Sequence, residues 1–176
     1  MDIISFLIDT LKYTLAGLVV FGVGYLVLRP YIRKQGHIQL LELKKGAQAQ
    51  LLPLRIQAYE RLVIFTERIN PVNMLIRLHV SGMSARELQN MVITEIRNEY
   101  QHNIAQQLYV GDAAWEMVRK LKDETINMVK NAALGLPEDA SGTELSRTIL
   151  SHLAKQEESP YDTALLIIKR DMSQLY

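Results

Sequence analysis

The chain has 176 residues, of which 48% are hydrophobic and 22% charged, and it contains no cysteine. The absence of cysteine excludes a disulfide framework and thiol chemistry. A formal net charge of +1, without a basic face carrying stacking aromatics or a recognisable binding module, excludes a nucleic-acid-binding function.

The hydrophobic residues concentrate in one stretch, Leu11 to Leu28, which carries a single charge at Lys12. As a helix this stretch rises about 27 Å, close to the thickness of a hydrocarbon core. A signal peptide needs a positive region before the apolar run and a small-residue cleavage site after it, and neither is present. A soluble core helix would show a polar face, which Val19–Leu28 lacks. We therefore expect a transmembrane helix.

The charges that flank this helix predict its orientation. Only Lys12 lies near its start, whereas five basic residues follow its end: Arg29, Arg33, Lys34, Lys44 and Lys45. Positive flanks stay on the cytoplasmic side. We expect a single span in the inner, cytoplasmic membrane, with the N-terminus outside and the C-terminal domain in the cytoplasm. These five residues would also lie at the membrane surface, where each contributes ~1 kcal/mol of attraction to anionic lipid, although setting the topology is a sufficient role for them.

Small side chains lie along one side of the predicted span. Thr10, Gly17 and Gly24 recur every seven residues, and Thr14 lies on the same side. In lipid, small residues let a second helix approach closely. They predict a helix-packing face, although glycine is common in membrane helices and the chain has no G-x-x-x-G spacing here. Asp9 and Lys12, three residues apart, are expected to pair at the outer boundary.

The remaining sequence predicts helices only. Ile38 to Leu52 reads as one helix, and Pro53 should kink it or start a new one. In the next helix the apolar stripe is Ile56, Tyr59, Leu62, Val63, Thr66 and Ile69. Asn70 and Pro71 then have the cap and first-position residues of a short helix that should end near Gly82.

Four further helical patterns follow. Ser84 and Glu87 have capping-box spacing ahead of a helix to about Tyr109, whose stripe is Leu88, Val92, Ile96, Tyr100, Ile104 and Leu108. Gly111 should break it, and Asp112 should cap the next helix, whose stripe is Trp115, Val118, Leu121, Thr125, Val129 and Ala132. After a polar loop, Thr143 should open a short helix. Ser159 and Pro160 should begin the last one, whose stripe is Tyr161, Ala164, Leu165, Ile168, Met172 and Leu175.

These patterns predict an all-α fold: one N-terminal transmembrane helix followed by a compact cytoplasmic bundle of five to seven helices. We expect three segments, namely residues 1–28 with the span, a basic juxtamembrane helix or linker over 29–55, and a helical domain over 56–176. A stalk of the rotary-synthase type is the architectural alternative. Pro53, Pro71 and Gly82 argue against such a long uninterrupted rod.

The chain carries no catalytic motif of the common kinds, including G-x-x-x-x-G-K, G-x-S-x-G and H-E-x-x-H. Glu99 and His102 form one E-x-x-H, but a carboxylate-bridged di-iron site needs a second such pair and two further glutamates, so a solvated helix face is the favoured interpretation. Asp123 and Glu124 are more simply explained as exposed positions than as an acid–base pair. We expect no catalytic residue, metal or cofactor.

Two blocks, AYERLVIFTERINPVNMLIRLH over residues 58–79 and QQLYVGDAAWEM over 106–117, resemble an uncharacterised bacterial family of small single-span membrane proteins, a domain of unknown function. The resemblance implies a span followed by a helical domain and no activity. The polar positions of the first block are Glu60, Arg61, Glu67, Arg68, Asn70 and Arg77, which capping and ion pairing would explain equally well.

The expected function is that of a membrane-anchored helical adaptor or accessory subunit of a larger membrane protein complex, with no catalysis. Its partners would be the lipid bilayer and other membrane subunits or a second copy. Two alternatives stay open: a membrane-bound enzyme or ligand-binding module with a cryptic site between helices, and a homo-oligomeric membrane scaffold.

Overall fold

The structure, a computed structural model, describes residues 3–175, except for the side chains of residues 5, 30–44 and 47. Within these residues the chain forms helices and no strand, which confirms the all-α expectation. The chain divides into two compact units, Met1–Gln50 and Leu51–Tyr176.

Helix α1 (Ile3–Ile69) supplies the described part of the first unit and the beginning of the second. Pro53 lies inside α1, so the expected start of a new helix there is wrong, and Pro53 does not interrupt this long helix. Proline removes one backbone hydrogen bond, at a cost of ~3 kcal/mol. Burial of the following turns, from Ala58 to Ile69, keeps the chain helical after that loss.

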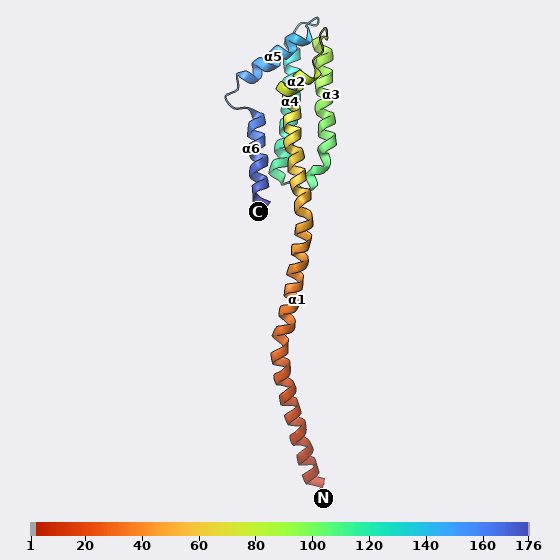
Figure 1. The fold of residues 1–176 in the computed structure, drawn as a ribbon, viewed down its shortest axis with the longest axis vertical. Coiled ribbons are helices and arrows are strands. Elements are labelled where there is room, and N and C mark those ends of the chain that lie inside the picture. The colour runs from red at the N-terminus through yellow and green to blue at the C-terminus, as the bar shows by residue number, and fades with distance from the viewer. Residues whose placement is uncertain (1–2, 176) are drawn as a thin grey trace. The chain divides into compact units, whose positions relative to one another are not determined.

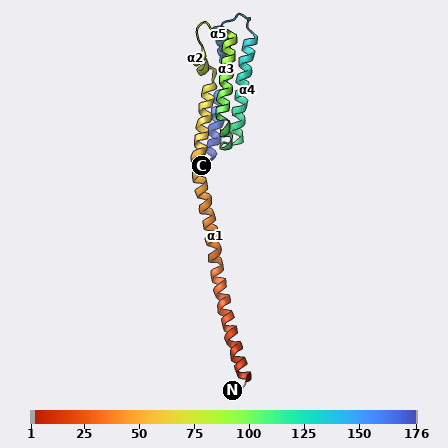
Figure 2. The same cartoon turned by 90° about the vertical axis from the view of Figure 1, so that its right-hand side faces the viewer.

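The second unit is a bundle in which α3, α4 and α6 run alongside the last turns of α1 (Figures 1 and 2). Helices α2 and α5 lie at the end of the unit where α1 stops. The elements after α1 are α2 (Pro71–Leu78), α3 (Ala85–Asn103), η1 (Ile104–Leu108), α4 (Asp112–Leu134), α5 (Gly142–Ala154), α6 (Pro160–Met172) and η2 (Ser173–Leu175).

Most helix starts lie where the sequence predicts them. Asn70 caps α2, Ser84 forms a capping box with Glu87 at the start of α3, and Ser159 caps α6. The backbone amide and hydroxyl of Ser84 both donate to the Glu87 carboxylate, and these bonds lower its pKa. Helix α5 begins at Gly142 rather than Thr143, because Ser141 provides a second capping box that the sequence analysis missed.

The predicted cap at Asp112 is wrong. The N-cap of α4 is Gly111, which uses no side chain, and Asp112 lies in the first turn. Gly111 donates its amide hydrogen both to the Tyr59 hydroxyl and to Asp171 Oδ2, each at 3.1 Å. A β-carbon at this position would lie 2.5 Å from Asp171 Oδ2. A larger residue at this position would therefore force the Asp171 carboxylate to move and would disturb its bond to the Gly111 amide.

The core of the second unit joins α1, α3 and α4 through an aromatic cluster. Phe65 is fully buried and meets the Tyr100 ring edge-on, with 6.3 Å between centroids. Tyr100 stacks on Trp115 at 5.6 Å, and Lys122 Nζ lies 4.5 Å from the centre of the Tyr100 ring. Trp115 is half-buried rather than fully inside, packed against the core.

The stripe predicted for α3 fails at its end. Leu88, Val92 and Ile96 are buried, but Leu108 is 78% exposed and Ile104 is 37% exposed. The chain changes from α-helix to 3-10 helix at Ile104. The tighter 3-10 helix turns further per residue, so positions four apart no longer share a face with the preceding helix.

Candidate functional site

The first unit presents one segment that is long and apolar enough to span a membrane, Phe6–Arg29 within α1. It extends the predicted span of residues 11–28 by a few residues on the N-terminal side. None of its most apolar window is buried against another part of the described chain. Among the described residues of its unit, this segment therefore has no packing partner.

The predicted packing face of this segment is open. A β-carbon added at Gly17 or Gly24 would meet no atom within 4 Å. The hydroxyls of Thr10 and Thr14 donate to backbone carbonyls one turn earlier, at 2.8 Å to Phe6 and 2.9 Å to Thr10. Their polar atoms are therefore satisfied inside the helix, as an apolar surrounding would require.

The charged flanks are only partly described. Asp9 and Lys12 pair at 3.2 Å, as predicted. The Arg29 guanidinium lies 5.9 Å from the centre of the Tyr25 ring, and Lys45 is exposed. The side chains of Arg33, Lys34 and Lys44 lie outside the described residues.

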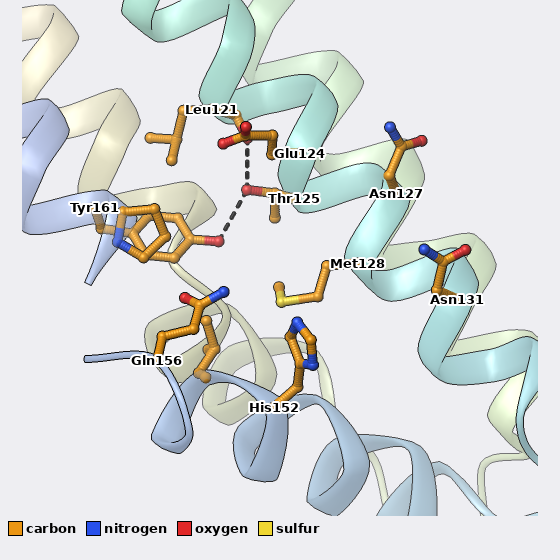
Figure 3. Close-up of a pocket in the computed structure, with 11 residues that line it drawn as sticks. Leu121, Glu124, Thr125, Asn127, Met128, Asn131, His152, Gln156 and Tyr161 are labelled. Atoms are coloured by element: carbon orange, nitrogen blue, oxygen red, sulfur yellow. Dashed lines mark hydrogen bonds between the residues drawn. The ribbon is translucent and has the colours of Figure 1, made fainter. Parts of the chain in front are cut away.

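The second unit holds a cavity of about 350 Å³ between α4, α5 and α6 (Figure 3). Its lining residues share no motif and come from three helices and the α5–α6 connection. They are Leu121, Glu124, Thr125, Asn127, Met128, Asn131, His152, Leu153, Gln156, Pro160 and Tyr161. The volume is at the small end of the range typical for ligand pockets.

A pair of hydroxyls closes one side of this cavity. The Thr125 hydroxyl donates its single proton to the Leu121 carbonyl at 2.7 Å, so the Tyr161 hydroxyl, 2.8 Å away, donates to Thr125 (Figure 3). Burial raises the pKa of Tyr161 to about 12. Both side chains are buried and fixed, which gives the cavity a rigid wall.

This pKa predicts a loss of stability at high pH. The unfolded chain releases a tyrosine proton near pH 10, whereas folded Tyr161 holds its proton to about 12. Its contribution is complete below pH 10 and is lost as the pH rises toward 12, by roughly 2–3 kcal/mol in total. Urea unfolding of the full chain in detergent between pH 9 and 12 should show a shallower decline for Tyr161→Phe. Equal slopes for the two proteins would contradict the assignment.

A second polar cluster lies where α1, α4 and α6 meet. The Tyr59 hydroxyl donates to Asp171 Oδ2 at 2.6 Å, and Arg55 Nε donates to the Tyr109 carbonyl at 3.0 Å. Burial raises the pKa of Tyr59, and its bond to Asp171 acts in the same direction. The Tyr59 hydroxyl, Asp171 Oδ2 and Arg55 Nε each bond to another part of the chain, so this cluster joins helices.

The E-x-x-H pair of α3 does not form a common site. Glu99 accepts an ion pair from Arg68 Nε at 2.9 Å and its side chain is only 12% exposed, so the interpretation as a solvated face is wrong for Glu99. His102 is exposed. Within the described residues, no group of three or more histidine, aspartate or glutamate side chains is placed to hold a metal ion.

The polar residues of the first sequence block are largely structural. Arg68 and Arg77 pair with Glu99 and Glu95 on α3, and Asn70 caps α2. Glu67 accepts a hydrogen bond from Asn73. Capping and ion pairing thus explain most of this block without a binding role.

Asp123 and Glu124 are both exposed, as expected, but they differ in their surroundings. Glu124 lines the cavity and Asp123 does not. The sequence does not reveal the cavity, because its lining residues on α4 meet His152, Gln156 and Tyr161, which lie further along the chain, only after folding. The one available signal was the four-residue spacing of Asn127 and Asn131, which places two amides on the same side of α4.

Comparison with known protein families gives one match, to a model described as "Family of unknown function (DUF7935)", over residues 5–175. No curated protein and no solved structure matches the chain.

Proposed function

Because the chain belongs to DUF7935, a family of unknown function, we propose its role from its own residues. It is a membrane-anchored helical adaptor or accessory subunit of a larger membrane protein complex, and it performs no catalysis. In this proposal it is a single-span bacterial protein of the inner membrane.

The apolar segment Phe6–Arg29 carries the proposal. Its most apolar window is unburied in its own chain, and side chains such as Leu15, Val20 and Phe21 are more than half exposed. An apolar surface of this extent is unstable in water and marks a membrane or partner contact. A helix of this length fits the hydrocarbon core of a bilayer.

The charge distribution supports the proposed orientation. Residues 29–55 hold six basic residues against Glu42 alone, whereas the residues ahead of Leu11 hold Asp2 and Asp9 and no basic residue. Basic flanks favour the cytoplasmic side. The bundle would then lie in the cytoplasm and the N-terminus outside.

The adaptor role is supported by the contrast between the two units. In the bundle, all fully buried side-chain polar atoms of the described residues have a hydrogen-bond partner. Its buried polar groups therefore need no contact from another protein. The span instead leaves Gly17 and Gly24 open. A small-residue face of this kind suits close packing against a helix of another membrane subunit.

The test is crosslinking in native membranes, followed by mass spectrometry of what co-purifies with a carboxy-terminally tagged chain. We expect one stoichiometric membrane protein, lost in Gly17→Leu/Gly24→Leu because the added side chains block close approach. Gly22→Leu is the matched control. It lies roughly 140° around the helix from Gly17, and its surroundings are equally open.

Two outcomes contradict this proposal. If the chain is a lone monomer both in crosslinked membranes and in mild detergent, it has no partner, and the adaptor role is excluded. Self-crosslinks alone, lost in the same double variant, would instead favour a homo-oligomeric scaffold.

A further inference from the structure

The cavity between α4, α5 and α6 contains hydrogen-bonding groups that the bundle does not use. Its internal bonds join Thr125 to Leu121 and to Tyr161. The side chains of Asn127, Asn131 and Gln156 are exposed at the rim of the cavity, and their amides take no part in these bonds (Figure 3). Polar groups gathered around an apolar recess are the usual composition of a small-molecule site.

The charges around the cavity favour a cationic ligand over an anionic one. No lysine or arginine lines the cavity, and Glu124 is its one carboxylate. A phosphate or carboxylate ligand would find no fixed positive charge to bind. An ammonium group would find a carboxylate acceptor and amide oxygens, which make stronger bonds to a charged donor.

The apolar residues that line the cavity favour a ligand with an aromatic group. Met128, Leu153 and Pro160 line the cavity together with the Tyr161 ring. A thioether and an aromatic ring both make favourable contacts with a flat aromatic group. His152 reaches toward Met128 from α5 (Figure 3) and adds a second ring to this side.

We propose that this cavity binds a small monocationic organic amine with an aromatic body. The ammonium group would lie near Glu124, and the ring would lie between Met128, His152 and Tyr161. The amides of Asn127, Asn131 and Gln156 would bond to polar atoms on the ring. This inference does not depend on the proposed membrane role, because every residue in it belongs to the second unit.

One existing contact competes with such a ligand. Lys120 Nζ lies 3.8 Å from Glu124 Oε1, with both side chains more than half exposed. A pair this long and exposed is weak and is screened by salt. A ligand ammonium that also gains ring contacts inside the cavity would displace Lys120 from Glu124.

The test is isothermal titration of the full chain in detergent with tryptamine and, separately, with indole-3-propionate. These probes share the ring and differ in carrying an ammonium or a carboxylate group. We expect tryptamine to bind and indole-3-propionate to bind at least about tenfold more weakly. Glu124→Gln should weaken tryptamine binding by about tenfold, since the neutral amide cannot pair with the ammonium.

Asp123→Asn is the matched control, because it removes the same charge from the neighbouring residue, which does not line the cavity. It should leave tryptamine binding unchanged. A second variant, Met128→Lys, should abolish binding by filling the recess with a positive charge. The proposal is overturned if tryptamine does not bind, if both probes bind equally, or if Glu124→Gln and Asp123→Asn have the same effect.

Discussion

The double substitution Leu15→Asp/Val19→Asp is expected to remove the chain from the membrane. Both residues lie in the apolar segment Phe6–Arg29 and are exposed, on the side opposite Gly17 and Gly24. An aspartate near the centre of a span costs roughly 2.5–3.5 kcal/mol in insertion. Two of them would cost about 5–7 kcal/mol, and aspartate adds no positive charge that would alter the orientation.

Alkaline carbonate extraction of membranes measures this effect. The unchanged chain should stay in the pellet, and the double variant should move to the supernatant or be degraded. The matched control is Leu134→Asp/Leu166→Asp, which adds the same charges at positions on α4 and α6 that are 82% and 67% exposed. If the two double variants behave alike, the segment is not an anchor.

The substitution Phe65→Ala is expected to have the largest effect on the stability of the bundle. Phe65 is fully buried in α1 and packs edge-on against Tyr100, which in turn stacks on Trp115. Removing a buried phenylalanine costs ~3–5 kcal/mol through lost burial and the cavity left behind. This is a large part of the 5–15 kcal/mol typical of a folded domain.

Urea unfolding of the full chain in detergent, followed by Trp115 fluorescence, measures this loss. Trp115 is the chain's one tryptophan and belongs to the affected cluster. Ile64→Ala is the control, because Ile64 is the preceding residue of α1 and is 55% exposed. A loss for Phe65→Ala no larger than that for Ile64→Ala would contradict the described packing.

The sequence predicts most helix boundaries because local chemistry determines them. Asn70 with Pro71, Ser84 with Glu87, and Ser159 with Pro160 each act within one turn. Where a predicted helix boundary is wrong, tertiary contacts are the reason. Asp112 is a suitable cap by type, yet the bonds from Gly111 to Tyr59 and Asp171 begin the helix one residue earlier.

The buried face of α1 is also predicted only in part from the sequence. The predicted stripe contains Tyr59, Leu62, Thr66 and Ile69, and all four are buried. It omits Phe65, because Val63 gives an equally regular spacing from Ile56. In the structure, Ile56 and Val63 are only partly buried. A spacing rule determines a helix face only to within about one residue, and the partner helix determines the rest.

Of the two candidate sites, one is visible in the sequence and the other is not. The apolar segment of α1 is a continuous run and is visible in the sequence, as are Thr10, Thr14, Gly17 and Gly24. The cavity is not, since it brings Glu124 and Asn131 of α4 next to His152 of α5 and Gln156 just beyond it. Only the packing of α5 against α4 places these side chains around one space.

The most direct test of the proposed membrane role uses the absence of native cysteine. Single cysteines at Ile4, Val20 and Leu134 would be treated with a membrane-impermeant maleimide in intact and in lysed cells. We expect Ile4→Cys to be labelled in intact cells, Leu134→Cys only after lysis, and Val20→Cys in neither. Labelling of Val20→Cys in lysed cells, together with recovery of the chain from the soluble fraction, would contradict a membrane-spanning helix.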